Sequence, residues 1–351
     1  MAEPCRCFQG ARTVTAPADG TLVVIGNFDG VHHGHRAVLL AGAAAARERG
    51  LAPFVLTFHP HPTVVLRGAK PSPLTTIDFR VRLLCDVEPT LTVVVEPFTR
   101  ELAALSPRQF ATHLLADALG ARVVLVGQNF RFGSGRTGDV ETLKKLGSEL
   151  GFEARAHQLL GDEAGCFSSS RVRAALTVGD VREASRVLGR PHAISGRVVA
   201  GDGRGRKLGA ATANLEQVAE VLPPDGVYAC RVERMSRTGQ GDPLALGVAN
   251  IGVRPTIGAS QRTVEVHLLD VEADLYGLWL RVYLVHRLRA ERAFCGLDEL
   301  REQIARDIET ARRALSPGGR PSASDTSDPA AAPPAVGRSI AGLADKASVK
   351  P

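Results

Sequence analysis

The chain has 351 residues, of which 44% are hydrophobic and 23% charged, so it is long enough for two domains with separate cores. Its formal net charge of +6 is scattered along the sequence without a long basic block, so we do not expect nucleic acid as a partner. We find no signal peptide, no run of apolar residues long enough to cross a membrane, and no disulfide framework among the six cysteines. These features predict a soluble, cytoplasmic protein that does not bind membranes.

The first half of the chain alternates between two kinds of element. Short apolar runs predict buried strands at Leu22–Ile25, Pro53–Phe58, Val93–Val95 and Ala121–Val126. Helical patterns lie between them at Arg36–Glu48, Arg80–Leu84 and Pro107–Leu119, the last with Ser106 as N-cap. For residues 1–20, before the first strand, we predict an irregular segment. This alternation predicts a parallel sheet covered by helices on both faces, with ligands bound beyond the carboxyl ends of the strands.

A glycine-rich turn, Gly26–His35, joins the first strand to the first helix. Its glycines allow close approach of the backbone to a ligand, and the helix start offers free N–H groups, so the turn suits phosphate. His32 and His35 are three residues apart and can both donate to phosphoryl oxygens. The spacing fits neither the P-loop nor the dinucleotide fingerprint. A zinc pair and a purely structural turn remain the alternatives.

The turn resembles the H-x-G-H element of the nucleotidylyltransferase superfamily, in which the two histidines bind the phosphates of ATP. The resemblance implies that the pair stabilises negative charge as pyrophosphate leaves.

Two later segments of the first half also suit a nucleotide ligand. Gly127–Gly133 follows the fourth strand and combines glycines with Asn129 and the aromatic Phe130. Phe167–Arg173 places three serines and two arginines at a helix entrance, which favours a phosphate clamp. Serines before a helix are also ordinary caps, so each segment alone is weak evidence.

The second half is rich in short β runs from Gly196 onward, which predicts an antiparallel barrel or sandwich. The runs are Arg197–Ala200, Val227–Val232, Leu244–Asn250, Thr263–Leu269 and Leu278–Leu284. A helix over Leu297–Leu315 closes the domain, and residues 316–351 have the composition of a disordered tail. Near its start the domain carries a glycine-rich basic loop, Gly201–Gly209, that could hold nucleotide phosphates.

The whole set resembles the bacterial bifunctional riboflavin kinase/FAD synthetase family over roughly residues 12–315. The matching segments are Gly26–His35, Thr57–Pro62, Leu74–Thr76, Gly127–Gly133, Ser168–Arg173, Gly209–Asn214, Asn250–Thr256, Val264–Asp270 and Asp274–Gly277. The resemblance implies an α/β nucleotidylyltransferase domain with a Rossmann-like parallel sheet at 12–186, and an antiparallel β-barrel riboflavin kinase domain with a closing helix at 187–315. It implies two ATP-dependent reactions, from riboflavin to FMN and from FMN to FAD with release of pyrophosphate.

The same resemblance suggests roles for individual residues. Catalytic roles fall to His32, His35 and Glu265. ATP or phosphate in the first domain would contact Gly26, Phe28, Asp29, Gly34, Ser168, Ser169, Ser170 and Arg173, and flavin would contact His61, Asn129 and Phe130. In the kinase domain the phosphate residues are Gly203, Gly205, Lys207 and Gly209. Thr212 and Asn214 offer hard oxygen ligands for Mg²⁺. ATP, riboflavin and FMN are then substrates, and self-association of the chain stays open.

The sequence departs from the family pattern at three positions, which are His59, Asn129 and Ala211. Ala211 replaces a proline and removes some rigidity from the kinase loop. Two alternatives follow: a different cytidylyl- or adenylyltransferase, which would leave residues 196–315 unexplained, and a flavin-binding regulatory protein that has lost one or both activities. A nucleic-acid-binding module is a third and weaker one.

Overall fold

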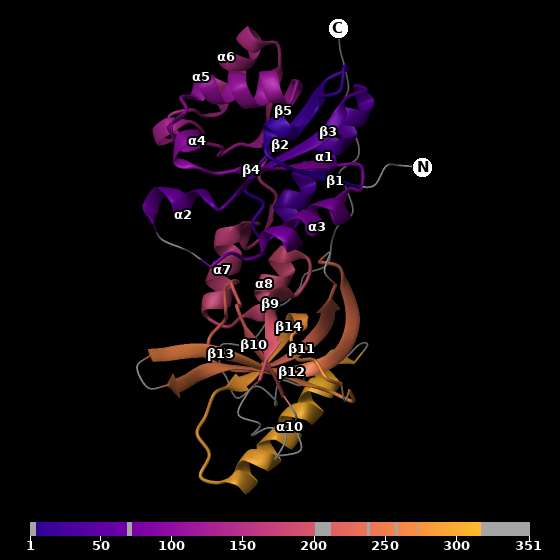
Figure 1. Ribbon diagram of the computed structural model, residues 1–351, viewed down its shortest axis with the longest axis vertical. Helices are drawn as coiled ribbons and strands as arrows, with labels where there is room; N and C mark the ends of the chain where they lie inside the picture. The colour runs from indigo at the N-terminus through magenta and orange to yellow at the C-terminus, as the bar shows by residue number, and fades with distance from the viewer. Residues whose placement is uncertain are drawn as a thin grey trace.

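The computed structural model describes residues 5–68, 72–200, 212–236, 239–256, 259–271 and 273–316. Its two main bodies are a parallel sheet with helices on both faces and a β-barrel, and two short helices, α7 and α8, lie between them (Figure 1). The domain order expected from the sequence is confirmed. The predicted tail lies outside the described residues, as does the loop 201–211.

The first body is built on a six-stranded, wholly parallel sheet. Its strands are β1 (Arg6–Gln9), β2 (Thr21–Ile25), β3 (Ala52–His59), β4 (Thr92–Pro97), β5 (Ala121–Gly127) and β6 (Glu153–His157). The spatial order is β1-β4-β3-β2-β5-β6, so the chain reverses its direction of travel across the sheet between β2 and β5. Ligands of open α/β sheets bind at such a switch point, outside the carboxyl ends of the strands.

Helices cover both faces of this sheet. The helices are α1 (His33–Glu48), α2 (Pro62–Arg67), α3 (Ile77–Val87), α4 (Arg100–Ala104), α5 (Pro107–Phe110), the π-helix η2 (Ala111–Ala118) and α6 (Val140–Leu150), with short 3-10 turns η1 (Ala11–Thr13) and η3 (Ser134–Arg136). On β2, Leu22 and Val24 face the core shared with α1 and α3, whereas Val23 and Ile25 face the core shared with η2 and α6. Because both faces are buried, the strand reads as a continuous apolar run.

The sheet contains two edge strands that the sequence pattern did not indicate. The segment taken as an irregular entry holds β1, which pairs with β4, and β6 follows α6 at the opposite edge. Both strands are mostly exposed or half-buried, so neither carries the apolar run that marks a central strand.

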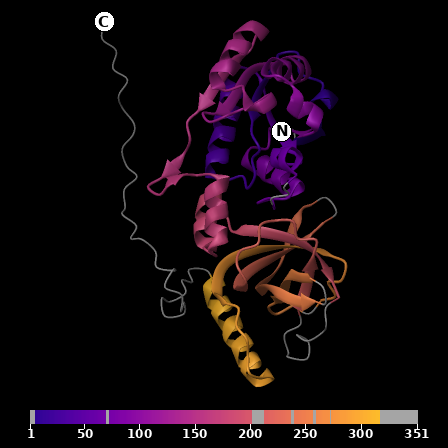
Figure 2. The same cartoon turned by 90° about the vertical axis from the view of Figure 1, so that its left-hand side faces the viewer.

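The second body is a closed six-stranded barrel in the order β10-β13-β12-β11-β14-β9, which decides between the barrel and the sandwich. Its strands are β9 (His192–Val199), β10 (Thr212–Glu216), β11 (Gly226–Met235), β12 (Gly241–Thr256), β13 (Ala259–Leu268) and β14 (Trp279–Ala290). The predicted closing helix is α10 (Leu297–Leu315), which packs Ala311, Ala314 and Leu315 on the outside of the barrel (Figure 2).

The two bodies share a seam. Helices α7 (Ser169–Thr177) and α8 (Val181–Leu188), preceded by the small hairpin β7 (Gly161–Asp162) and β8 (Gly165–Cys166), belong to one hydrophobic core with the barrel strands. Leu74, from the loop before α3, joins the same core. The backbone of Val221, in the barrel, donates to the carbonyl of Pro73 at 2.9 Å. The core therefore continues across the boundary at 186/187 that the sequence suggests.

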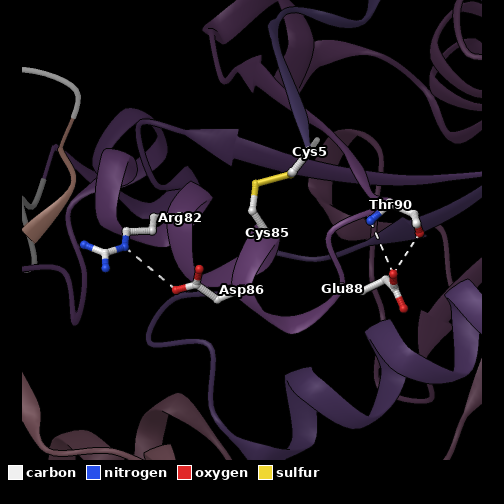
Figure 3. Close-up of a disulfide and its surroundings, with 6 residues drawn as sticks. All are labelled: Cys5, Arg82, Cys85, Asp86, Glu88 and Thr90. Atoms are coloured by element: carbon white, nitrogen blue, oxygen red, sulfur yellow. Dashed lines mark hydrogen bonds and ion pairs between the residues drawn. A yellow bond between two sulfur atoms is a disulfide. The ribbon is translucent and has the colours of Figure 1, made fainter. Parts of the chain in front are cut away.

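A disulfide joins Cys5 to Cys85 and ties the segment before β1 to α3 (Figure 3). The sequence pattern, which showed no disulfide framework, did not indicate this bond. The partners are 80 residues apart in the sequence, and a pairing over such a distance depends on the fold rather than on spacing.

Within the described ranges, none of the helices combines the length and the apolar character needed to cross a bilayer.

The seam contains a buried histidine whose protonation should affect stability. His192 is 1% exposed, its Nε2 lies 2.8 Å from the carbonyl oxygen of Val221, and burial lowers its pKa to about 4. Between pH 6.5, the ordinary pKa of an unfolded histidine, and pH 4, His192 is protonated in the unfolded chain but stays neutral in the folded protein. His192 therefore contributes stability that is present above pH 6.5 and is lost as the pH falls toward 4.

We expect His192→Gln to reduce the loss of unfolding free energy between pH 7 and pH 4.5 by roughly 2–3 kcal/mol. Urea denaturation followed by the fluorescence of the single tryptophan, Trp279 on β14, measures this loss. The matched control is His113→Gln, at an exposed position on η2, which should leave the loss unchanged. An unaltered pH dependence in His192→Gln would contradict the assignment.

Candidate active sites

The turn Gly26–His35 leaves the central strand β2 at the switch point of the sheet. Because the strands are parallel, the ends of β3 and β5 lie at the same edge, on either side of β2. His59 is the last residue of β3, His61 follows that strand, and Asn129 follows β5, so the sheet brings three sequence-predicted segments to one edge. This placement agrees with the expectation from the strand pattern.

Packing of aromatic and glycine residues shapes the turn. The ring of Phe28 is 1% exposed and folds back over Gly26, where an added Cβ would lie 2.9 Å from the ring. Only glycine fits beneath the ring without a shift. Phe28 also contacts the His35 ring edge-on, with centroids 5.1 Å apart. The buried Phe28 side chain thus packs against His35, one of the two predicted catalytic histidines.

The two histidines of the motif lie against one another at the start of α1. Their rings stack with centroids 3.6 Å apart, and Nδ1 of His32 accepts a hydrogen bond from the backbone N–H of His35 at 3.3 Å. His32 is therefore the N-cap of α1. Since Nδ1 acts as acceptor, the proton of the neutral His32 ring is on Nε2, which leaves a donor for a ligand.

Both histidines are held neutral at physiological pH. Burial lowers the pKa of His32 to about 4, and the positive charges of Arg190 and His33 add to this effect. Burial likewise lowers the pKa of His35 well below its ordinary value, with His32, Arg80 and Arg190 contributing. Nδ1 of His35 is buried and makes no hydrogen bond to the described part of the chain. Such an atom is suited to a partner supplied by a substrate.

Asp29 is the polar centre of the site. Its carboxylate is 4% exposed and accepts hydrogen bonds from the backbone N–H groups of Leu74 at 2.9 Å and Thr75 at 3.2 Å. Arg173 of α7 donates to the same carboxylate at 2.7 Å and to the carbonyl of Ser72 at 2.8 Å. The Asp29 side chain thus binds protein groups and fixes the turn relative to the segment before α3.

The entrance of α7 lies against the start of α1. Ser168 caps α7 by accepting from the backbone N–H of Arg171 at 3.2 Å, and the hydroxyl of Ser169 donates to the carbonyl of Asp29 at 2.8 Å. An added Cβ at Gly34 would lie 3.2 Å from the carbonyl oxygen of Phe167, so glycine permits this approach. Ser170 is exposed. Two helix N-termini, each with free N–H groups and a partial positive charge, thereby converge.

The three predicted flavin residues border this site. Nδ1 of His61 caps α2 by accepting from the N–H of Thr63 at 3.3 Å, and its pKa is lowered by burial while the charge of Asp29 opposes the shift. Asn129 is exposed in the turn after β5. The half-buried Phe130 ring stacks on the buried ring of Phe132 with centroids 5.5 Å apart, which holds Phe130 in place.

A second group of predicted residues meets on the barrel. Thr212 and Asn214 lie on one face of β10, and Asn214 stands directly opposite Glu265 of β13. On the other side of Glu265, Asn250 of β12 is its register partner. Neighbouring residues of both strands, such as Ala213 and Val266, point into the buried core. The polar residues therefore share the outer face of three adjacent strands.

In the kinase domain the sequence analysis missed one strand, and the predicted phosphate residues lie outside the described part of the chain. The β runs predicted from the sequence did not include β10, in which Ala213 and Leu215 alternate with the polar residues and fill the barrel core. Gly203, Gly205, Lys207 and Gly209 lie outside the described residues. Arg289 of β14 binds the buried carboxylate of Asp307 on α10 at 2.8 Å.

Sequence reasoning missed two arginines of the first site. Arg80 of α3 is 2% exposed, donates to the carbonyl of Asn27 at 3.0 Å and lies 3.5 Å from Asp29. Its position on the apolar stripe of α3, with Leu84 and Val87, was the available signal. Arg190, after α8, donates to the carbonyl of Gly30 at 2.6 Å, a contact that no local pattern indicates.

Asp29→Asn tests the role of the buried carboxylate. The amide keeps the shape of the side chain but leaves Arg173 and the buried Arg80 without their counter-charge. We expect the free energy of unfolding to fall by about 3–5 kcal/mol, measured by urea denaturation. The control is Asp86→Asn, whose exposed carboxylate pairs with Arg82 on the same helix as Arg80 and should cost less than about 1 kcal/mol. Equal stabilities of the two variants would refute the role.

Comparisons with known proteins cover both bodies of the structure. The FAD synthetase family matches residues 15–171, and the riboflavin kinase family matches residues 188–315. The chain is 43% identical over 300 residues to a bifunctional riboflavin kinase/FMN adenylyltransferase of Escherichia coli (strain K12), covering 85% of this chain and 93% of that one. Identity to a protein of the same name from Pseudomonas fluorescens is 38% over 299 residues, covering 85% and 94%.

Among solved structures, the chain is similar to a Streptococcus pneumoniae protein described as a macrolide-efflux protein. The TM-score is 0.77 at 29% sequence identity, covering 88% of this chain and 99% of that one. The shared fold therefore extends over both bodies. Together with the matches of both domain families, it shows that the chain belongs to the bifunctional riboflavin kinase/FMN adenylyltransferase family and is an enzyme with both activities.

Proposed function

We propose that the two reactions take place at two separate sites, with FMN formed on the barrel and FAD formed at the edge of the parallel sheet. The observation that carries this division is the presence of two distinct groups of polar residues. One group holds His32 and His35 beside the N-terminus of α7, and the other holds Asn214 opposite Glu265. Each group has the residue types that its reaction needs.

In the sheet domain, an oxygen of the FMN phosphate attacks the α-phosphorus of ATP, and the bond to the leaving pyrophosphate breaks. Charge develops on the phosphoryl oxygens, so preorganised donors lower the barrier. His32 supplies its Nε2–H, and His35 supplies a neutral ring kept in place by stacking on His32 and by Phe28. No proton has to leave an amino acid for this transfer, which suits two histidines with lowered pKa values.

Other residues of this site bind phosphate or hold its binders in place. The backbone around Gly26 and Gly34, together with Ser168, Ser169 and Ser170 at the entrance of α7, lines the position for ATP phosphates. The side chains of Phe28 and Asp29 serve by shaping the turn, since both are buried against protein groups. Arg173 binds Asp29 and is half-exposed, so its guanidinium can hold the turn in place and also reach a phosphate.

The flavin is proposed to lie between the ends of β3 and β5. The half-buried ring of Phe130, supported by the buried Phe132, offers an apolar face for the isoalloxazine ring, and His61 and Asn129 offer polar contacts at its edges. This position sets the phosphate of FMN toward the histidine pair at the end of β2.

On the barrel, the 5′-hydroxyl of riboflavin attacks the γ-phosphorus of ATP, the bond from that phosphorus to the leaving ADP breaks, and Glu265 accepts the hydroxyl proton. Thr212 and Asn214 provide a hydroxyl and an amide oxygen on the same face, a donor set that fits Mg²⁺. When bound there, Mg²⁺ would offset the negative charge of the phosphates. Gly203, Gly205, Lys207 and Gly209 are proposed to cover the phosphates.

The extents of the two functional domains, the cellular location and the partners are also proposals. We take 12–186 and 187–315 as the extents of the two functional domains, while noting that α7 and α8 pack on the barrel. A cytoplasmic location, independence from nucleic acid and membranes, and self-association all stay predictions.

A pair of variants tests the division of labour. We expect His35→Ala to lower FAD formation from FMN at least 100-fold, because it removes a donor from the transition state, while FMN formation from riboflavin stays intact. Glu265→Ala should lower FMN formation about 100-fold or more by removing the base, while supplied FMN is still converted to FAD. Chromatography of riboflavin, FMN and FAD measures both.

The matched controls are His113→Ala on η2 and Glu302→Ala on α10, both at exposed positions outside the two sites. Each should keep both activities. Loss of both activities in a folded His35→Ala or Glu265→Ala protein would show that the two sites are not independent.

A further inference from the structure

The turn that carries the histidines has an unusual backbone. Phe28, Gly30 and Val31 all have positive φ angles, of 50°, 89° and 43°. Glycine adopts such angles freely, but a β-branched residue such as Val31 rarely does. A backbone of this kind persists only where surrounding contacts hold it, and such places gather at active sites.

One side of the turn is held by the segment before α3. The backbone N–H of Gly30 donates to the hydroxyl of Thr75 at 3.2 Å, and the N–H of Leu74 donates to the carboxylate of Asp29 at 2.9 Å. These bonds fix the N–H groups and the acidic side chain of the turn. The carbonyl groups of Gly30 and Val31 point to a different partner.

That partner is Arg190. Its Nη2 donates to the carbonyl of Gly30 at 2.6 Å, and its Nη1 donates to the carbonyl of Val31 at 3.3 Å and to that of Leu188 at 3.3 Å. The rigid fork of a guanidinium can bind two adjacent carbonyls at once, which a lysine ammonium cannot match in geometry. The carbonyl of Val31 immediately precedes His32, the N-cap of α1.

Arg190 reaches the turn from the kinase side of the molecule. It follows α8, which ends at Leu188, and precedes β9 of the barrel, within the segment matched by the riboflavin kinase family. Its guanidinium lies 5.7 Å from the ring centroid of Phe79 on α3, and the buried Arg281 of β14 lies 3.8 Å from the same ring. These contacts seat Arg190 at the seam between the two bodies.

We propose that Arg190 is a positioning residue for FAD formation: from the kinase segment, it clamps the carbonyls of Gly30 and Val31 and so sets the histidine pair. It touches protein groups rather than the reacting atoms. The second domain thereby completes the active site of the first, although its own reaction is separate. The inference rests on the proposed role of His32 and His35, so His35→Ala is assayed in parallel: normal FAD formation in His35→Ala would refute that role, whereas normal FAD formation in Arg190→Met alone would refute the clamp.

The test compares Arg190→Met with Arg190→Lys in the full chain. Methionine keeps an apolar stem and removes all donors, whereas lysine keeps the charge and loses the fork. For Arg190→Met we expect kcat for FAD formation from FMN to fall at least tenfold with KM for FMN changed less than about twofold, because small misplacements of catalytic groups reduce turnover strongly. FMN formation from riboflavin should stay within about twofold of the unaltered enzyme, and Arg190→Lys should recover only part of the loss.

Hydrogen exchange provides the readout that a general loss of stability would not give. In Arg190→Met, amides of residues 26–36 should exchange about tenfold faster, while the strands of the barrel keep their protection. The matched control is Arg182→Met, since Arg182 of α8 also crosses the seam, where its Nε donates to Nδ1 of His286 at 2.9 Å. It should leave FAD formation and exchange of the turn unchanged.

Four results would overturn the proposal. They are normal FAD formation in Arg190→Met, an equal loss of both activities, a selective loss without faster exchange of residues 26–36, and full recovery by Arg190→Lys. The last would show that charge alone suffices and that the two-carbonyl clamp is not needed.

Discussion

Asp29 lies where the turn after β2 meets the segment before α3, α3 itself and α7, and its buried carboxylate binds groups from each of them. A buried carboxylate is tolerable only when hydrogen bonds and opposite charges compensate it, so its partners must keep their places. These contacts of Asp29 fix the start of α1 and the entrance of α7 relative to one another. The arrangement of two helix N-termini around the proposed phosphate position depends on them, and so does the stacking of His32 on His35.

In the proposed division of the two reactions, each takes place on a different kind of scaffold. A parallel sheet gathers loops at one edge, which suits the transfer of AMP between two large ligands. A barrel strand instead fixes side chains at a spacing of two residues, which sets Asn214 beside Glu265 with little freedom. Helices α7 and α8 and Arg190 form the seam that joins these scaffolds. The side chains therefore pack without a break between the two bodies, although we assign a different reaction to each.

Local patterns in the sequence were sufficient for the central strands, the closing helix, the histidine turn and the serine cap of α7. They fail where structure depends on distant partners. The edge strands β1 and β6 have no apolar run, β10 alternates too briefly to be told from a loop, and the Cys5–Cys85 pairing spans 80 residues. Arg190 has no local signal in the sequence, and Arg80 has only its place on the apolar stripe of α3, because the carbonyls and the carboxylate that bind these guanidinium groups are supplied by the fold. The roles of individual site residues remain predictions for the same reason.

The most direct test of the account is to incubate the purified full chain with riboflavin, ATP and Mg²⁺ and to follow the flavins by chromatography over time. The account predicts that FMN appears first and that FAD then accumulates. Unchanged riboflavin, together with no FAD when FMN is supplied instead, would contradict it.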